Sequence, residues 1–362
     1  MKKVVILGGY GTFGSLISEQ LVGPECTVII AGRNAENGKA YADSINAQYM
    51  QCDTRDSNSL SKVIEGAFLV INASGPFQDT DYIIPKTCIN QGCHYIDLGD
   101  GRDYVEGITK LHQEAESKGL FVCVGASTSP AVTSAGVEAL ISKDQSVQSI
   151  KIALNAGNKN LAGVSTIASI LAYVGIPVQV WQDKRWQTHA GWSLGEFVAF
   201  PEPVGRRRVQ LCNVPDLELF PELFQADQVE FKAGVELTVF NYAISVLGWV
   251  KQVFPRLNLP GFAKSLVSLS KLFKSFGTLH GGCAVWATNS DGVQKSIAFV
   301  APQNGPRIPT APAVLLSRKL LKEGPPGLGT FPCIGFIHLD AYQSYLEPFD
   351  ISIVFGENGN WQ

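Results

Sequence analysis

The feature that most constrains the fold is a glycine-rich turn between an apolar strand and a helix. Residues 4–7 form an unbroken apolar run, and Gly9, Gly11 and Gly14 follow in a G-x-G-x-x-G pattern before a helix expected over residues 12–22. In this context Gly9 permits the tight turn, Gly11 lets the backbone approach a pyrophosphate, and Gly14 lets the helix pack closely on the strand. The helix N-terminus supplies N–H groups and a positive dipole to the phosphates. The turn therefore predicts a dinucleotide site.

Strand and helix signals alternate along the first 125 residues. Strands that are apolar throughout are typical of a parallel sheet covered by helices on both faces. Between them, segments such as residues 104–115 repeat apolar residues at helical spacing. The pattern predicts a Rossmann domain with a doubly wound parallel sheet. The expected strands are residues 4–7, 26–31, 49–52, 68–72, 94–97 and 120–124.

The middle of the chain predicts an α+β domain with a mostly antiparallel or mixed sheet. Its expected strands are residues 147–154, 229–232, 283–288 and 296–300, with a hairpin over 178–192 and helices over 163–174, 235–253 and 262–276. Residues 311–322 then read as a C-terminal helix. The expected boundaries are 1–130 for the Rossmann domain, 131–305 for the α+β domain and 306–362 for the C-terminal segment.

The end of the second expected strand indicates which nucleotide binds. NAD-specific sites place Asp or Glu about 20 residues after the glycines to hold the ribose 2′-OH. This chain has Arg33 there, and a guanidinium can pair with a 2′-phosphate and stack on adenine. The pattern favours NADP(H) over NAD. Asp53, after the third strand, is expected either at the adenine edge or as a turn cap.

Small residues follow the fourth expected strand and would let the ribose and nicotinamide pass close to the backbone. Together with the glycine turn they complete the predicted cofactor site. Its residues are Gly9, Tyr10, Gly11, Thr12, Phe13, Gly14, Arg33, Asp53, Asn72, Ser74, Gly75 and Pro76.

Composition excludes several classes of protein. Lys and Arg number 29 and Asp and Glu 32, so the net charge of −3 argues against a nucleic-acid partner. The eight cysteines show no CxxC pair, which predicts reduced thiols, a cytoplasmic location and no metal site. No apolar run approaches the roughly 18–20 residues that span a bilayer. Charged residues are only 17% of the chain, against about 25% in typical domains, so either the core is large or part of the surface is apolar.

Five segments in this order resemble the saccharopine dehydrogenase-like reductases. They read GYGTFG at residues 9–14, AGR at 31–33, ASGPF at 73–77, GCHYIDL at 92–98 and GASTSP at 125–130. The resemblance is specific over residues 1–140 and recovers near 305–309. It implies an NADP-type Rossmann domain, an inserted α+β domain that shapes the substrate site and often forms a dimer, and a C-terminal helix that returns to the Rossmann domain.

The resemblance implies cofactor and fold more narrowly than substrate, because such proteins include saccharopine and lysine dehydrogenases, carboxynorspermidine synthases and trans-acting enoyl reductases. We therefore expect an NADPH-dependent oxidoreductase that transfers a hydride to a C=N or activated C=C bond. Its substrate would be a small amino-acid-derived or acyl/polyketide molecule. The alternative is a non-catalytic NADP(H)-binding sensor or scaffold protein.

A second dehydrogenase group shares part of the pattern. The extended short-chain dehydrogenases carry a G-x-x-G-x-x-G turn and a Y-x-x-x-K pair, and Tyr82 and Lys86 have that spacing. The pair follows the fourth strand rather than the fifth, and Pro85 would interrupt a helix between its members. The sequence disfavours Tyr82 and Lys86 as a catalytic pair.

Hydride transfer needs a placed nicotinamide and a proton donor for the substrate. Tyr95 and Asp97, near the end of the fifth strand, and His280 are the predicted catalytic residues. The predicted substrate-binding residues are Ser127, Ser129 and His189. Alternatively, the two serines cap a helix that begins near Pro130, and the histidines are structural. A carboxylate substrate would need an arginine such as those of residues 206–208, although such a run is more often a solvated loop.

Residues 251–276 are apolar and basic. Over residues 262–276 helical spacing puts phenylalanines and leucines on one face and lysines and serines on the other. Within residues 232–290 the one acidic residue is Glu236, against six Lys and Arg. Such a helix predicts contact with a membrane surface or an acyl carrier, the alternative being the domain core or a homodimer interface.

Overall fold

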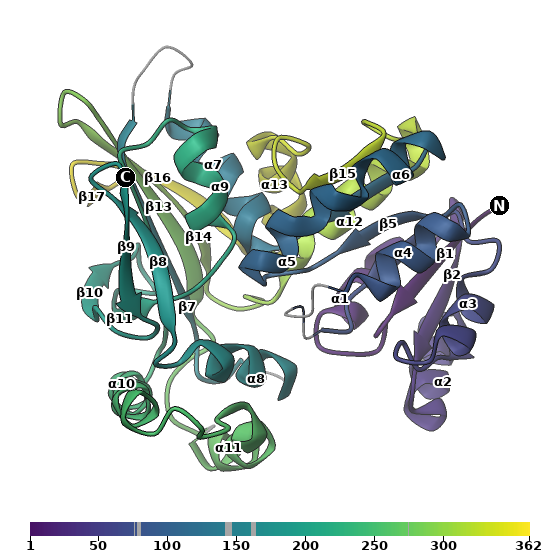
Figure 1. The fold of residues 1–362 in the computed structure, drawn as a ribbon, viewed down its shortest axis with the longest axis horizontal. Coiled ribbons are helices and arrows are strands. Elements are labelled where there is room, and N and C mark those ends of the chain that lie inside the picture. The colour runs from purple at the N-terminus through teal and green to yellow at the C-terminus, as the bar shows by residue number, and fades with distance from the viewer. Residues whose placement is uncertain (76, 78–80, 142–146, 161–163, 274) are drawn as a thin grey trace. The chain divides into compact units, whose positions relative to one another are not determined.

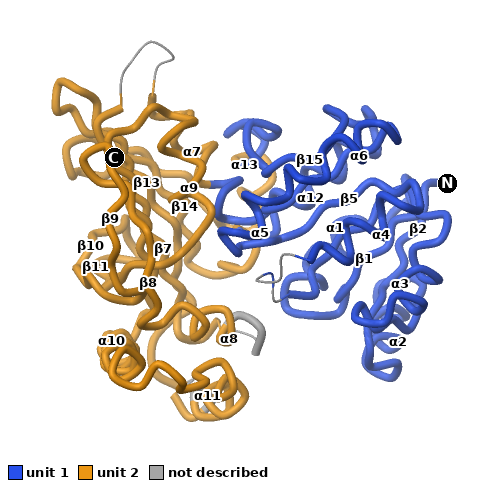
Figure 2. The backbone as a smooth tube through the Cα atoms, in the orientation of Figure 1, with its two compact units in different colours: residues 1–132, 309–342 blue, residues 133–308, 343–362 orange. Residues whose placement is uncertain are grey.

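The computed structural model describes residues 1–75, 77, 81–141, 147–160, 164–273 and 275–362. These residues divide into two compact units, coloured separately in Figure 2. Unit 1 contains residues 1–132 and 309–342, and unit 2 contains residues 133–308 and 343–362.

Unit 1 is a Rossmann-type domain. Its seven strands are all parallel and lie in the order β3-β2-β1-β4-β5-β6-β15 (Figure 1). The strands are β1 (Lys2–Leu7), β2 (Cys26–Gly32), β3 (Gln48–Gln51), β4 (Leu69–Asn72), β5 (His94–Asp97), β6 (Phe121–Val124) and β15 (Gly329–Pro332). The helices are α1 (Gly14–Leu21), α2 (Ala35–Ser44), α3 (Ser57–Ile64), α4 (Ile83–Asn90), α5 (Arg102–Glu106), α6 (His112–Ser117) and α12 (Arg307–Glu323). This order confirms the doubly wound parallel sheet predicted from the sequence.

The strand order defines where a ligand can bind. β1 pairs with β2 on one side and β4 on the other, so the direction of winding reverses between β1 and β4. Val4, Val5, Ile6 and Leu7 are fully buried because neighbouring strands flank β1 on both edges and helices cover both faces. In such sheets ligands bind beyond the carboxyl ends of the strands at this reversal.

The C-terminal segment differs from its expected course. Residues 309–342 join unit 1, whereas residues 343–362 join unit 2 and add β16 (Ser352–Glu357) to the second sheet. The predicted helix returns as α12, and a strand that was not predicted, β15, follows it and pairs with β6. Pro332 argues against a strand in the sequence because proline cannot donate a hydrogen bond in a sheet. β15 lies at the edge of the sheet, where a proline is tolerated.

Unit 2 has a mixed sheet, as predicted. β12 and β7 are parallel neighbours, and the other pairings are antiparallel. The strands are β7 (Val147–Ala156), β8 (Pro177–Gln182), β9 (Arg185–Ala190), β10 (Glu196–Ala199), β11 (Arg206–Leu211), β12 (Gln228–Val235), β13 (Gly281–Asn289), β14 (Gln294–Ala301), β16 and β17 (Asn360–Trp361). The remaining α-helices are α7 (Thr133–Leu140), α8 (Val164–Tyr173), α9 (Asp216–Leu223), α10 (Thr238–Val253), α11 (Ala263–Ser270) and α13 (Leu339–Leu346), the last crossing the boundary between the units.

Several predicted elements are shorter or different. The helix expected over 262–276 is α11 between two short 3₁₀ turns, η3 (Pro260–Phe262) and η4 (Lys271–Phe273). The helix expected over 104–115 is divided between α5, a 3₁₀ turn and α6. The arginine run at 206–208, expected as a solvated loop, lies in β11, where all three arginines pair with residues of β10.

Within the described residues no helix is both long enough and apolar enough to cross a membrane.

Candidate cofactor-binding site

The glycine turn begins one residue earlier than the motif suggested. Gly8, which directly follows β1, has a φ of +73°, a conformation that favours glycine. Its N–H donates to the Ala31 carbonyl at 2.8 Å, and its own carbonyl accepts the Gly11 N–H at 2.8 Å. Gly9, expected to permit the tight turn, is instead packed, because a Cβ there would lie 2.9 Å from the Ile6 carbonyl oxygen. The turn starts directly after β1, and Gly8 is the residue of the turn that adopts the left-handed conformation.

Gly14 is packed tightly against the start of the turn. A Cβ on this residue would lie 2.1 Å from the Gly8 carbonyl oxygen, so only glycine lets α1 begin this close to the turn. Ser18, buried in α1, secures the arrangement. Its Oγ lies 2.9 Å from the carbonyl oxygen of Gly9 and 2.8 Å from that of Gly14, so its single O–H lies within hydrogen-bond distance of both acceptors.

The outer part of the turn is accessible. Gly11 and Thr12 are exposed and Phe13 is half-buried, at the N-terminal end of α1. A Cβ at Gly11 would meet only the Gly8 carbonyl oxygen, at 3.1 Å. The backbone is thus open to close approach in front of a helix N-terminus, which fits a pyrophosphate group.

Arg33 follows β2 and is exposed. Its backbone is held on both sides. Tyr10 accepts the Asn34 N–H at 2.9 Å, and the Gln51 side chain donates to the Arg33 carbonyl at 3.1 Å. The Tyr10 ring packs on Gly32, where a Cβ would lie 2.4 Å from the ring. Tyr10 therefore joins the glycine turn to the strand end that carries Arg33, which leaves the guanidinium free to meet a 2′-phosphate.

Asp53 forms a turn after β3. Its Oδ1 accepts the Arg55 N–H at 3.1 Å, and its own N–H donates to Ser59 Oγ at 3.1 Å. The side chain is exposed. The turn role, one of the two alternatives, is present, and contact with adenine stays a prediction.

Asn72 ends β4 beside the glycine turn. Its Oδ1 accepts the N–H of Ser74 at 3.0 Å and the Ser74 hydroxyl at 2.5 Å. A Cβ at Gly8 would lie 3.1 Å from the Ser74 side chain, so the loops after β1 and β4 are in contact. Gly75 is half-buried, and Pro76 lies outside the described residues. These loops meet at the reversal of the sheet order, where a nucleotide would cross it.

Tyr95, Asp97 and Tyr104 form a fully internal polar chain. The Tyr104 hydroxyl donates to Asp97 Oδ2 at 2.5 Å and lies 3.5 Å from the Tyr95 hydroxyl, which accepts from Asn72 Nδ2 at 3.1 Å. Asp97 Oδ1 accepts the N–H groups of Gly99 and Gly125 at 2.9 and 3.0 Å. Tyr95 and Asp97 are both fully buried.

Burial raises the pKa of Asp97 to about 6, although its hydrogen bonds from Tyr104 and two backbone N–H groups oppose the change. Burial also raises the pKa of Tyr95 and Tyr104 well above the ordinary value. Through Asn72 this chain reaches Ser74, so it fixes the loop that faces Gly8. The geometry suits positioning of that loop, and direct catalysis by Tyr95 or Asp97 stays a prediction.

Tyr82 and Lys86 do not form a pair. The Tyr82 hydroxyl donates to the Tyr104 carbonyl at 3.0 Å, whereas Lys86 Nζ donates to the Asp81 carbonyl at 2.7 Å. Burial raises the pKa of Tyr82 to about 12, the opposite of what an acid/base tyrosine needs. Pro85 fits within the first turn of α4, where an N–H has no partner in the helix.

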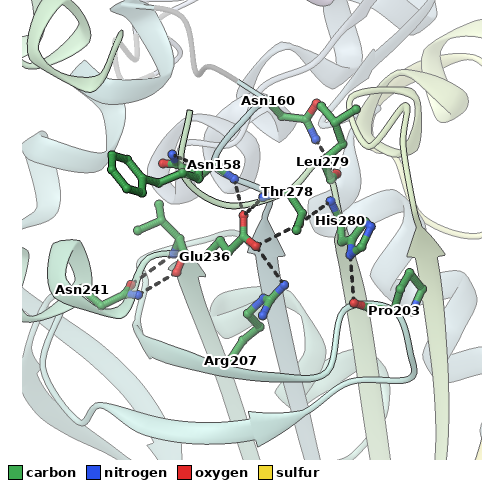
Figure 3. Close-up of polar contacts among 11 residues, drawn as sticks. Asn158, Asn160, Pro203, Arg207, Glu236, Asn241, Thr278, Leu279 and His280 are labelled. Carbon is green, nitrogen blue, oxygen red and sulfur yellow. Dashed lines mark hydrogen bonds and ion pairs between the residues drawn. The ribbon is translucent and has the colours of Figure 1, made fainter. Parts of the chain in front are cut away.

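The remaining candidates lie in two places. Ser127 and Ser129 follow β6 in unit 1. Ser127 is half-buried and its carbonyl accepts the Val132 N–H at 3.3 Å, and Ser129 is buried in the turn before α7. His189 and His280 belong to unit 2, where their ring nitrogens lie 3.3 Å from Gln182 Oε1 and 3.0 Å from the Pro203 carbonyl oxygen (Figure 3 shows His280). Their roles in substrate binding and catalysis stay predictions.

Two residues that position this site were not identified from the sequence. Ser18 resembles any helical serine, and Tyr104 was assigned only to a helix core. Gly8 belongs to the alternative G-x-x-G-x-x-G reading of the turn, and its place directly after the first strand is the signal for its role. In the described residues no group of three or more His, Cys, Asp or Glu side chains is arranged to hold a metal ion.

Comparison with known proteins agrees with this geometry. Residues 4–123 match the family defined by the saccharopine dehydrogenase NADP binding domain. A lipid droplet localized protein of Caenorhabditis elegans is 26% identical over 133 residues, which are 33% of this chain and 31% of that protein. This chain therefore aligns with about a third of that relative's length.

The fold matches a solved enzyme over its whole length. Apo histidine-tagged saccharopine dehydrogenase (L-Glu forming) from Saccharomyces cerevisiae aligns with a TM-score of 0.69 and 12% identity, covering 99% of this chain and 100% of that chain. At this identity the likeness concerns the fold. Residues 4–123 thus match the saccharopine dehydrogenase NADP binding domain, and the described chain has the fold of a saccharopine dehydrogenase.

Proposed function

We propose that the protein is an NADP(H)-dependent oxidoreductase that transfers a hydride to a C=N or activated C=C bond of a small amino-acid-derived or acyl substrate. The observation that carries this proposal is the cradle formed by Gly8, Gly11 and Gly14 in front of α1, with exposed Arg33 at the next strand end. The family match of residues 4–123 supports the same nucleotide.

In this proposal the chain's residues bind and orient the cofactor, which supplies the hydride when bound. The N–H groups at the start of α1 hold the pyrophosphate, and Arg33 pairs with the 2′-phosphate. Asn72 and Ser74 hold the loop after β4 against the glycine turn, beside the proposed path of the ribose and nicotinamide. Tyr95, Asp97 and His280 are our candidates for supplying or relaying the substrate proton.

The test of the cofactor assignment is Arg33→Asp. A carboxylate would repel the 2′-phosphate and could accept hydrogen bonds from a ribose 2′-OH, so NADPH affinity should fall at least tenfold while NADH affinity is unchanged or rises. Lys62→Asp, an equal charge change at an exposed position of α3, is the matched control and should change neither affinity. Equal losses for both nucleotides with Arg33→Asp would refute the 2′-phosphate contact.

The rival function is an NADP(H)-binding sensor or scaffold without turnover. It is kept because the candidate donors Tyr95 and Asp97 are fully buried. A panel of imine and enoyl-thioester substrates with NADPH separates the two functions. Oxidation of NADPH that depends on one of these substrates supports the reductase, whereas tight NADPH binding with no oxidation across the panel supports the sensor.

We propose a cytoplasmic location. All eight cysteines are free thiols, and seven of them are buried. Burial raises the pKa of Cys88 and Cys123 well above the ordinary value, which keeps these thiols protonated and unreactive.

A further inference from the structure

Unit 2 concentrates exposed hydrophobic side chains in one segment. Twenty large hydrophobic side chains are exposed among the described residues, and ten of them lie within residues 238–276. We call these ten the α10–η4 surface: Val239, Tyr242, Val246, Trp249, Val253, Phe254, Phe262, Leu269, Leu272 and Phe276. Single exposed apolar residues are ordinary, but such a concentration marks a surface that something covers. The surface begins twelve residues before the segment expected from the sequence, at 239 rather than 251.

The helices of this segment are apolar on two sides. On α10, Val239, Val246 and Trp249 recur at the spacing of one helical face, and Trp249 is 66% exposed. The other side is already used, because Ile244 and Leu247 pack with the core cluster around α8. α10 and α11 lie together in Figure 1, and η4 touches α10 through the edge-to-face contact of Phe273 with Phe240. The apolar side of α10 that carries Val246 and Trp249 therefore stays exposed although the opposite side packs in the core.

The segment is fixed at both ends rather than frayed. Glu236, just before α10, accepts the N–H groups of Asn158 and Thr278 at 2.9 and 2.7 Å (Figure 3). The Asn158 side chain in turn donates to the carbonyls of Phe273 and Phe276 at 2.8 Å each. One buried carboxylate thus joins the entry and exit of residues 238–276. The apolar surface is therefore held on an anchored element.

The charge of the segment indicates its partner. No acidic residue occurs between residues 237 and 290, whereas five lysines and arginines do, at 251, 256, 264, 271 and 274. Arg256 and Lys264 are exposed. A second copy of the chain would bring these cations together across a two-fold axis. An anionic lipid surface would instead attract the cations at its headgroups and receive the apolar side chains between its acyl chains.

We propose that the α10–η4 surface binds an anionic phospholipid surface, with Trp249 and Leu272 inserted among the acyl chains and Arg256 and Lys264 at the headgroups. The helices lie in the interface plane, as amphipathic helices without a spanning length do. The proposal concerns where the protein acts and does not depend on the hydride-transfer chemistry proposed for unit 1.

The test is flotation of the full chain with vesicles of phosphatidylcholine alone and with 30% phosphatidylserine added. The wild-type protein is expected to float with the anionic vesicles. The fraction recovered with phosphatidylcholine alone should be at least tenfold lower. Trp249→Glu and, separately, Leu272→Glu should each lower recovery on anionic vesicles at least tenfold. The matched control is Leu223→Glu, at a 46% exposed position of α9, which should float like the wild type. The two variants alter different elements, and the circular dichroism of each identifies a variant that has not folded.

Three results would overturn the proposal. The first is no recovery of the folded wild-type protein on anionic vesicles, and the second is equal recovery of wild type and the folded variants. Recovery that does not depend on phosphatidylserine would overturn the assignment of an anionic surface. Light scattering identifies the competing occupant, because a dimer that Trp249→Glu converts to monomers, without vesicle binding, means that a second copy covers this surface.

Discussion

Glu236 and Thr278 are joined by two hydrogen bonds. Glu236 Oε2 accepts the Thr278 N–H at 2.7 Å, and Oε1 accepts the Thr278 hydroxyl at 2.8 Å (Figure 3). Arg207 Nη2 lies 3.4 Å from the same Oε1. Because Glu236 precedes α10 and Thr278 follows η4, this contact holds together the two ends of the segment that contains α10, α11 and η4.

Replacing Glu236 with Gln should weaken the contact between the two ends of this segment. The variant keeps one acceptor oxygen but leaves Arg207 without its buried counter-charge, so we expect unit 2 to lose about 2–3 kcal/mol of unfolding free energy. Urea unfolding measures the loss, and hydrogen exchange locates it at residues 238–278. Glu222→Gln, at an exposed position of α9, should change stability by less than about 0.5 kcal/mol. Equal stability of the two variants would contradict the role of Glu236.

Acid should have the same effect as this substitution. Burial opposes ionisation of Glu236, but the N–H donors of Asn158 and Thr278, the Thr278 hydroxyl and Arg207 outweigh it and hold the pKa of Glu236 below its ordinary value. Its stabilisation is therefore present at neutral pH and lost as the pH falls through the lowered pKa. Exchange protection of residues 238–278 should fall below about pH 4 in the wild type. In Glu236→Gln this acid step should be absent, and its persistence would assign the step to another group.

Asp97 should give the opposite dependence on pH. Burial raises its pKa to about 6, so the folded state favours the protonated acid. This contribution is fully present below about pH 4 and is lost as the pH rises through 6. A pKa that is about two units higher in the folded state than in the unfolded state corresponds to roughly 3 kcal/mol of unfolding free energy. Asp97→Asn is neutral at every pH, so its unfolding free energy should lose the Asp97 part of this decline between about pH 4 and 6, while Asp100, whose pKa burial also raises to about 6, still contributes its own part. Parallel curves for wild type and variant would refute the assignment.

Tyr104→Phe provides an independent control on the same step. The Tyr104 hydroxyl donates to Asp97 and lowers its pKa, so removing the hydroxyl should move the midpoint of the stability decline to higher pH. An unchanged midpoint would mean that this hydrogen bond does not control the ionisation of Asp97.

Gly14→Ala tests the glycine turn. The added Cβ would lie 2.1 Å from the Gly8 carbonyl oxygen, so α1 or the turn must move. We expect NADPH affinity to fall more than tenfold and stability to fall by about 2–3 kcal/mol. Gly23→Ala adds a Cβ with no atom within 4 Å and should leave both quantities unchanged. Unchanged NADPH binding by Gly14→Ala would contradict the proposed pyrophosphate site.

Local pattern was sufficient to predict much of unit 1. The apolar strands and glycine turn specify the sheet because β4, β5 and β6 bury both faces and each glycine of the turn meets backbone in its neighbours. β15 was missed because Pro332 is unusual in a strand, and its edge position becomes evident only when β6 is placed beside it. Tyr104 was identified only as a helix residue, because its hydroxyl contact with Asp97 joins separate elements.

Unit 2 was predicted less completely because its contacts are long-range. Hydrophobic spacing identified helices in residues 235–276, but it could not distinguish which apolar side is covered by α8 and which is exposed. Glu236 drew attention only as an isolated acid in a basic region. Its importance comes from Thr278 and Arg207, which the sheet brings to it from residues far away in the chain.

The most direct test of the central claim is calorimetric titration of the wild-type protein with NADPH and with NADH under identical conditions. With Arg33 at the end of β2 and a phosphate cradle at the start of α1, we predict one NADPH bound per chain, with at least tenfold higher affinity than NADH. Absence of NADPH binding, or equal affinity for the two nucleotides, would contradict the account.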